Sequence, residues 1–437
     1  MRKNLFKKVL ALTLASTMAF SMAGCGSKGG SSDAKNDDGT ITLNVWHQWS
    51  NDTNELKGKY EEAVKAYEKE NPGVKIKTET LDTEAYKTKI NAEFAGDAKG
   101  IDVFYWWGAG TAKKLVDAGK VMALDDYVTD DVKSKILEGS TSAFEFDGKL
   151  YSVPMFSWYM TLFCNKTMFD KAGATLPTTY DELVDAVKKL KKLDGVTPMA
   201  AGAKDGWNAA FVYQALALRE VGATGVNEML SGKKEFGDEG FKKAAQKVSD
   251  LYEMGAFGDN PLEQGNDDAN AAFENGKAAM RVMGSWFANN VYTHDAATIK
   301  PEEVVALKIP TIADGKGEAT DYCGGFVESF WVNNNTKYKE EAAKFCIYIN
   351  EKMGVASYET GSGFSGWTTP ADESNLNPLF IQIKDLLAEG KQGVLAWDTS
   401  LESEPAAVHN EQVQTLFADG ADIDAFIDEH KAAINGK

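Results

Sequence analysis

The chain has 437 residues, of which 43% are hydrophobic and 26% charged, and its formal net charge is −18. This length and apolar content suit two or three domains with cores of their own. The negative charge argues against nucleic acid and anionic lipid surfaces as partners, because binding to either requires basic surface.

Cysteine and histidine spacing argues against a metal site. The four cysteines are Cys25, Cys164, Cys323 and Cys346, and none has the C-x-x-C spacing of a structural zinc site. The four histidines also lie far apart in the sequence. We therefore expect no metal ion, no cofactor and at most one disulfide among the three later cysteines. Cys164 and Cys346 lie within apolar runs, which favours core positions for both.

The N-terminus has the layout of a secretory signal. Residues 1–8 contain four basic side chains, residues 9–20 are mainly apolar, and the small residues Ala23 and Gly24 follow. The apolar run is shorter than the roughly 20 residues that span a membrane. We therefore assign residues 1–24 to a cleaved lipoprotein signal peptide.

A cysteine follows this signal directly. Met22-Ala23-Gly24-Cys25 resembles the bacterial lipobox, in which the cysteine is lipidated and becomes the mature N-terminus. Residues 25–40 contain almost nothing apolar, which is typical of a flexible tether. We expect acyl chains on Cys25 to anchor the protein on the extracellular face of the cell membrane. The alternative is an ordinary signal peptide cut beside a cysteine.

The first part of the folded chain alternates between strands and helices. The expected elements in chain order are a strand at 41–46, a helix ending at Asn71-Pro72-Gly73, a strand at 74–78, a helix through 86–94, a strand at 101–106 and a short helix through 115–116. This spacing indicates βαβ units on a mainly parallel sheet. Ligands of such sheets lie beyond the carboxyl ends of the strands, where this chain has aromatic and polar residues at 46–49 and 105–108.

The second part of the chain repeats the α/β pattern. The expected elements are an extended segment at 151–154, a helix opened by a capping box at Thr179 and Glu182, helices at 211–218 and 241–251, strands at 278–283 and 307–310, an extended stretch at 324–332, and C-terminal helices at 342–349, 378–387 and 423–434. Pro154 excludes a regular central strand at 151–154, so this segment suits a crossing between lobes.

Several stretches together resemble the sugar-binding family of extracellular solute-binding proteins of ABC importers, which includes maltose-binding protein. The matching stretches are 101–107, 151–154, 162–166 with Phe169, 176–183, 273–280 running into Gly284-Ser285-Trp286, and 333–345. They cover the whole chain in the order and spacing of the family. Cys164 departs from the family pattern, which more often has an aromatic residue there.

The resemblance implies a two-lobed α/β fold of the periplasmic-binding-protein type, in which each lobe is a mainly parallel sheet flanked by helices. We place the three crossings between the lobes near Pro154, Val327 and Glu373. The N-terminal lobe would comprise 41–154 plus 328–375, and the C-terminal lobe 155–327 plus 376–437. A ligand between the lobes would favour their closure.

The resemblance also implies the partners. We expect a monomeric receptor that captures a small carbohydrate, more specifically an oligosaccharide, and delivers it to ABC permease subunits in the membrane. The permease and its ATPase must be separate chains, because this one has no second apolar run of membrane length and no Gly-x-x-x-x-Gly-Lys-[Ser/Thr] loop.

Sugar chemistry guides the choice of candidate ligand-binding residues. A sugar has hydroxyls around its edge and C–H patches on its faces, so a receptor needs polar side chains for the edge and aromatic planes for the faces. The candidates that combine these properties with predicted strand ends or loops are Trp46, Gln48, Trp49, Trp106, Trp107, Phe156, Trp158, Trp207, Asn208, Trp286, Glu328, Phe364, Trp367 and Trp397.

Core packing is the alternative for each of these aromatic residues, because large aromatics also dominate protein interiors. Trp286 has additional support, since it follows a predicted strand within Gly-Ser-Trp. Trp106 and Trp107 are adjacent at a strand end, so one of the two must point away from the core. Glu328 lies between apolar residues near a predicted crossing, where a buried carboxylate needs a partner.

Other functions remain open from the sequence. An exported glycan-active enzyme would share aromatic residues and need two opposed carboxylates, but no motif singles out such a pair. A lipoprotein adhesin or scaffold would have no small-molecule site. A receptor for a different small solute, such as a peptide, a polyamine or a metal ion, is the third alternative.

Overall fold

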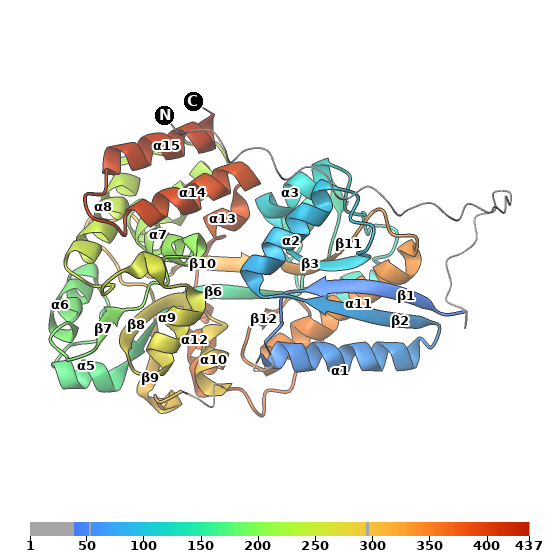
Figure 1. Ribbon diagram of the computed structural model, residues 1–437, viewed down its shortest axis with the longest axis horizontal. Helices are drawn as coiled ribbons and strands as arrows, with labels where there is room; N and C mark the ends of the chain where they lie inside the picture. Colours follow the sequence, from blue (N-terminus) through green and yellow to red (C-terminus); the bar gives the residue numbers. More distant parts are fainter. Residues whose placement is uncertain (1–38, 52–53, 294–296, 437) are drawn as a thin grey trace, which may run out of the picture.

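The computed structural model describes residues 39–51, 54–293 and 297–436 (Figure 1). The predicted signal peptide, Cys25 and all of the tether before Gly39 lie outside the described residues. Two sheets, each covered by helices, lie beside each other in the folded part (Figure 1). The predicted two-lobed α/β architecture is confirmed.

The first sheet has the strand order β11-β3-β1-β2. Its strands are β1 (Ile41–His47), β2 (Val74–Thr80), β3 (Val103–Trp107) and β11 (Glu328–Val332). β1 is parallel to both β2 and β3, whereas β11 is antiparallel to β3. Its helices are α1 (Glu55–Glu70), α2 (Thr83–Ala95), α3 (Ala109–Asp117), α4 (Asp130–Lys135) and α11 (Lys339–Glu359).

The second sheet is mixed, with the strand order β13-β10-β6-β8-β7 and with β9 and β12 also paired to β6. Its strands are β6 (Phe156–Asn165), β7 (Thr197–Met199), β8 (Ala278–Gly284), β9 (Val304–Leu307), β10 (Asp321–Phe326), β12 (Phe364–Ser365) and β13 (Gln392–Val394). All antiparallel pairs involve β6, while β10–β13 and β7–β8 are parallel. The sequence predicted more parallel pairing here, because it did not reveal that the long β6 runs against its neighbours.

Helices cover this second sheet and form the C-terminal end of the chain. They are α5 (Lys166–Ala172), α6 (Tyr180–Leu190), α7 (Gly206–Leu230), α8 (Glu239–Glu253), α9 (Asn266–Glu274), α10 (Phe287–Thr293), α12 (Pro378–Ala388), α13 (Trp397–Ser400), α14 (Ser403–Thr415) and α15 (Ile423–Asn435). The predicted capping box opens α6, where Thr179 accepts from the Glu182 amide at 3.3 Å. A hairpin of β4 (Glu145–Phe146) and β5 (Lys149–Leu150) precedes β6.

The chain passes between the two sheets three times, before β6, between β10 and β11, and between α11 and α12. The second passage is the shortest, because only Val327 separates β10 from β11. Each sheet has its own core of buried residues. The exact bounds of the two lobes stay a prediction.

A chain of buried hydrogen bonds joins four helices of the second lobe, α7, α13, α14 and α15. The Trp397 amide donates to Gln214 Oε1 at 3.3 Å, which directs the Gln214 amide nitrogen to His409 Nε2 at 3.0 Å. His409 Nδ1 lies 2.9 Å from His430 Nε2, and His430 Nδ1 lies 2.8 Å from the Phe426 carbonyl oxygen. These partners assign the proton of both neutral rings to Nδ1. The short helix α13 is therefore fixed firmly to α7, α14 and α15.

His47 lies in the other core, next to Tyr60 and Trp49. Its Nδ1 accepts from the Trp49 amide at 3.2 Å. Burial, with a smaller effect from the charge of Lys57, lowers the pKa of His47 from 6.5 to about 3. The folded protein therefore keeps this ring neutral at pH values where the unfolded chain protonates it.

We predict that acid destabilises the protein through His47. Between pH 6.5 and about 3 the unfolded state binds a proton at His47 and the folded state does not. As the pH falls through this range, this group should therefore lower the free energy of unfolding by about 1.4 kcal/mol per pH unit. His47→Asn keeps an acceptor for the Trp49 amide but cannot titrate. Urea unfolding at pH 7.5 and pH 5 should show a smaller loss of stability in the variant. Equal losses in both proteins would contradict the assignment.

Candidate functional site

Three partly buried tryptophans meet where the two sheets adjoin. Trp107 ends β3 and packs against side chains of both cores. Trp207 lies in the first turn of α7, and Trp286 lies two residues after the end of β8, with 6.4 Å between their ring centroids. Trp158 lies behind Trp286 at a centroid distance of 5.0 Å, in an edge-to-face contact. Aromatic faces from both lobes therefore gather in one region.

Local sequence explains how two of these rings are placed. Side chains alternate along β3, so Trp106 is buried at 4% exposure while Trp107 is only partly buried. The Trp286 ring lies directly against Gly284, where an added Cβ would be 2.0 Å from a ring carbon. The glycine of Gly284-Ser285-Trp286 is thus required for the position of the indole.

Lys87 of α2 links the tryptophans of the two lobes. Its Nζ lies 5.2 Å from the ring centroid of Trp107 and 5.9 Å from that of Trp207. Both distances are in the range of cation–π attraction, which is worth roughly 0.5–1 kcal/mol at exposed sites and more where water is excluded. Lys87 also pairs with Glu84, one turn earlier on α2, at 3.0 Å.

Glu328 is the buried carboxylate of this region, with 6% of its surface exposed. It is the register partner of Trp107, whose Nε1 donates to Glu328 Oε1 at 3.1 Å. Glu328 Oε2 has no hydrogen-bond partner within the described part of the chain. Burial raises the pKa of Glu328 to about 8, the charge of Lys87 opposes this rise, and the charge of Asp398 adds to it.

Asp398 approaches from the C-terminal lobe on α13. Its Oδ1 is buried and lacks a partner among the described residues, and burial raises the pKa of this carboxyl against the opposing charge of Lys87. The backbone of α13 is held against α3, because Thr111 Oγ1 lies 3.3 Å from the carbonyl oxygens of both Asp398 and Thr399. Gly110 permits this approach, since an added Cβ would be 2.3 Å from the Leu401 carbonyl oxygen.

Two amide oxygens elsewhere in the fold share the same property. Gln48 Oε1, beyond the end of β1, and Asn410 Oδ1, on α14 against Gly206, are buried and lack hydrogen-bond partners within the described residues. Each buried acceptor left without a donor costs roughly 1–3 kcal/mol. Glu328 Oε2 and Asp398 Oδ1 can therefore each accept a hydrogen bond from a hydroxyl or amide donor of a ligand.

We call Lys87, Trp107, Trp207, Trp286, Glu328 and Asp398 the junction cluster. Four of its members, Trp107, Trp207, Trp286 and Glu328, are candidates from the sequence. The other two, Lys87 and Asp398, are not in that candidate set, and the sequence analysis missed Lys87. No sequence signal distinguished Lys87, because it is one of many lysines on predicted helices. Only the tertiary structure distinguishes it, by bringing its ammonium group over Trp207 of α7 and near enough to affect Asp398 of α13.

Most other candidates lie within the two packed cores. These are Trp46, Trp49, Trp106, Phe156 and Trp367 in the core of the first sheet, and Trp158 and Trp397 in the core of the second. The side chain of Asn208 is also buried. Its Nδ2 donates to Asn266 Oδ1 at 3.4 Å, and its Oδ1 accepts from Arg281 Nη2 at 3.2 Å. Phe364 stacks on Phe380 at 4.7 Å. Ligand contact by these residues stays a prediction.

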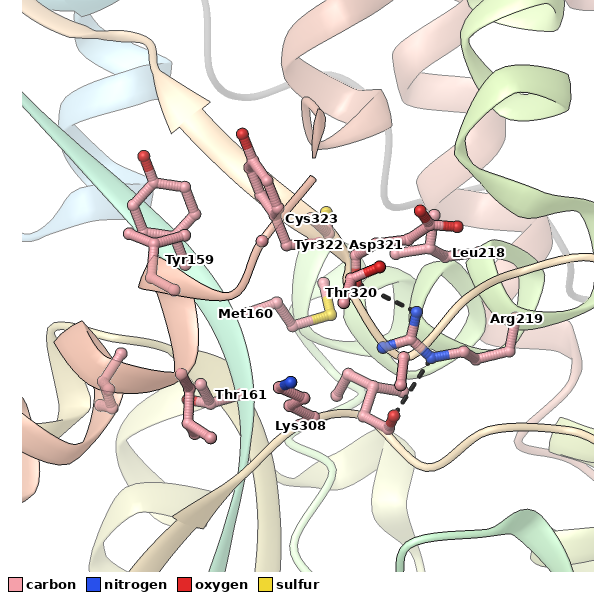
Figure 2. A pocket seen from close by; sticks show the side chains of 16 residues that line it. Tyr159, Met160, Thr161, Leu218, Arg219, Lys308, Thr320, Asp321, Tyr322 and Cys323 are labelled. Atoms are coloured by element: carbon pink, nitrogen blue, oxygen red, sulfur yellow. Dashed lines mark hydrogen bonds between the residues drawn. The ribbon is translucent and has the colours of Figure 1, made fainter. Parts of the chain in front are cut away.

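A separate pocket lies in the C-terminal lobe beside β6 and β10 (Figure 2). Tyr159 and Tyr322 stand at one side of it, and Arg219 donates to the carbonyl oxygens of Ile309, Glu318 and Asp321 at 3.1, 2.6 and 3.1 Å. None of the buried side-chain atoms that lack a partner in the described residues belongs to a residue lining this pocket. Its buried polar side-chain atoms thus have partners, unlike Glu328 Oε2 and Asp398 Oδ1 of the junction cluster.

The residues that the structure describes lack two kinds of feature. They contain no group of three or more His, Cys, Asp or Glu side chains arranged to hold a metal ion. None of their helices combines the length and the apolar character needed to cross a membrane. Cys164, Cys323 and Cys346 are buried and form no disulfide.

Known proteins match most of the chain. Residues 50–355 match the family described as bacterial extracellular solute-binding protein. A solved structure from a study of xylan utilization by the thermophilic bacterium Caldanaerobius polysaccharolyticus is 36% identical, with a TM-score of 0.85 over 90% of this chain and 99% of that one. A chitin oligosaccharide binding protein has a TM-score of 0.81 at 22% identity and covers 91% of this chain and 98% of its own.

A curated relative extends the comparison at the sequence level. The multiple sugar-binding protein of Streptococcus mutans is 24% identical over 368 residues, which are 81% of this chain and 80% of that protein.

We predict that ionisation of Glu328 opposes folding at high pH. The unfolded chain loses this proton near pH 4.5 while the folded protein keeps it up to about pH 8, so stability falls as the pH rises between these values. Glu328→Gln retains an acceptor for Trp107 Nε1 and cannot ionise. Its Tm relative to the original protein should therefore increase steadily from pH 5 to pH 8. A difference independent of pH would contradict the raised pKa.

Proposed function

We propose that this chain, which belongs to the family of bacterial extracellular solute-binding proteins, is the carbohydrate receptor of an ABC importer. In this role it is a binding protein and not an enzyme. Its ligand is an oligosaccharide held between the two lobes and passed to permease subunits in the membrane. The structure from the study of xylan utilization, the chitin oligosaccharide binding protein and the multiple sugar-binding protein support this class of ligand.

One observation carries the proposal. Aromatic side chains from both lobes, at Trp107, Trp207 and Trp286, are joined by contacts with Lys87 and with one another. Trp107 also donates to Glu328, and the buried oxygens Glu328 Oε2 and Asp398 Oδ1 lack donors among the described residues. A sugar supplies both complements, because its C–H faces stack on indoles and its hydroxyls donate to carboxylates. A peptide or a metal ion would satisfy only part of this surface.

The distribution of these groups supports a closing mechanism. Trp107 and Glu328 belong to the first sheet, whereas Trp207, Trp286 and Asp398 belong to the second lobe. A ligand that contacts both sets binds the closed arrangement better than an open one and thus shifts the population toward closure. The single residue Val327 between β10 and β11 is a natural place for the required change in backbone angles.

We also propose that acyl chains on Cys25 anchor the receptor at the outer face of the membrane. Residues 26–40 then give the domain freedom to turn toward the permease. A single chain anchors only marginally, so stable attachment requires two or more.

We predict that Cys25→Ala separates anchoring from binding. The variant should appear in the medium, or in the soluble fraction of the envelope, while the original protein stays with the membranes. Its ligand affinity should be unchanged, because the tether precedes the folded domain. Detergent partitioning measures the first property and titration calorimetry the second. Membrane retention of the variant would disprove lipid anchoring at Cys25.

We predict that an oligosaccharide stabilises the folded domain and quenches its tryptophan fluorescence. At a hundredfold excess over Kd the stabilisation is about 2.7 kcal/mol. A panel of xylan-, chitin- and mannan-derived oligosaccharides, screened by thermal shift, would identify the sugar.

Two variants locate the site. Trp286→Ala should lower affinity at least tenfold, whereas Tyr322→Ala, at the pocket of Figure 2, should bind normally. The reverse result would move the site to that pocket. A panel without any response, or cleavage of the bound oligosaccharide, would disprove the receptor proposal.

A further inference from the structure

The ammonium group of Lys87 lies between tryptophans of the two lobes. It has the indole of Trp107 on one lobe and that of Trp207 on the other, at 5.2 Å and 5.9 Å. Two buried carboxylates, Glu328 and Asp398, lie close enough for the charge of Lys87 to act on both. Aromatic faces together with carboxylates are the usual surroundings of a bound ammonium group.

The ion pair between Lys87 and Glu84 on α2 does not explain why the Lys87 ammonium group lies against the two tryptophans. Ion pairs three residues apart on an exposed helix contribute little to stability, and a lysine can form them while pointing into solvent. Lys87 instead turns toward two tryptophans while keeping its contact with Glu84. The side chain therefore gains from the junction cluster as well as from its own helix.

The acidic groups explain why a cation is needed there. Glu328 Oε2 and Asp398 Oδ1 have no hydrogen-bond donor within the described residues. Two buried carboxylates near each other repel, and a nearby positive charge reduces the cost. Among the described residues, Lys87 is the only positive side chain that lowers the pKa of both Glu328 and Asp398.

We propose that Lys87 is an internal ligand and the specificity-determining residue of this site: its ammonium group fills the cation position, so the site excludes cationic solutes and accepts uncharged ones. This inference deepens the proposed function, on which it rests for the identity of the natural ligand. It means that an uncharged sugar meets a site whose charges are already balanced. Polyamines and amino sugars with a free ammonium group would have to displace Lys87.

Chemical rescue tests the proposal without knowledge of the sugar. Lys87→Ala removes the ammonium group and leaves a space beside Trp107 and Trp207. Ethylammonium chloride should then raise the Tm of this variant in a saturable manner, by about 1–3 °C at tenfold excess over Kd, compared with sodium chloride at equal concentration. The original protein and Lys87→Arg should show no such response.

Lys89→Ala is a matched control on the same helix. Lys89 also lies over an indole, at 4.4 Å from the Trp46 ring centroid, and pairs with Glu79. Unlike Lys87, Lys89 does not contribute to the shifted pKa of Glu328 or of Asp398. Lys89→Ala should therefore give no saturable response. Adding Glu328→Gln and Asp398→Asn to Lys87→Ala should abolish the rescue, which ties the effect to the two carboxylates.

The outcomes separate this inference from the proposed function. Absence of rescue in a Lys87→Ala protein with an unchanged circular dichroism spectrum overturns the inference, as does an equal response of the original protein. Rescue together with a glycan panel that gives no response would keep Lys87 as the internal cation and overturn the sugar proposal. Glycan binding without rescue would keep the receptor and remove Lys87 as its specificity-determining residue.

Discussion

The buried carboxylate of Glu328 is the constraint on which the candidate site depends. It begins β11 immediately after the chain has passed from one sheet to the other at Val327. One of its oxygens accepts from Trp107 across the β3–β11 pair, and the other has no donor in the described part of the chain. Ionising a carboxyl buried in this way is costly unless neighbouring groups or a ligand compensate the charge, which is why the pKa of Glu328 is raised to about 8.

Several features of the surrounding structure follow from that cost. Lys87 brings a positive charge toward Glu328 and Asp398, and the raised pKa of Glu328 reduces the charge of the pair near neutral pH. Gly110 allows α13 to carry Asp398 close to α3. The buried hydrogen bonds through Gln214, His409 and His430 then fix α13 to α7, α14 and α15. The site is thus supported by groups far from it in sequence.

Much of the fold could be predicted from the sequence, since periodicity and caps are local. The βαβ order of the first lobe, the capping box of α6 and the crossing near Val327 all correspond to short stretches of chain. The mixed second sheet could not be predicted, because strand direction around β6 depends on pairings between segments far apart. Alternation along β3 predicted that one of two adjacent tryptophans leaves the core, and it is Trp107.

The sequence by itself determined the fold class and the family resemblance, because both are encoded in local patterns of residue type. It also singled out Trp107, Trp207, Trp286 and Glu328 as candidates. Only the tertiary structure decided which aromatic residues pack in the cores and which gather with Glu328. Lys87 acquires its role solely because α2, α7 and α13 converge, and the charge of a lysine acts through space on carboxylates about 240 and 310 residues further along the chain.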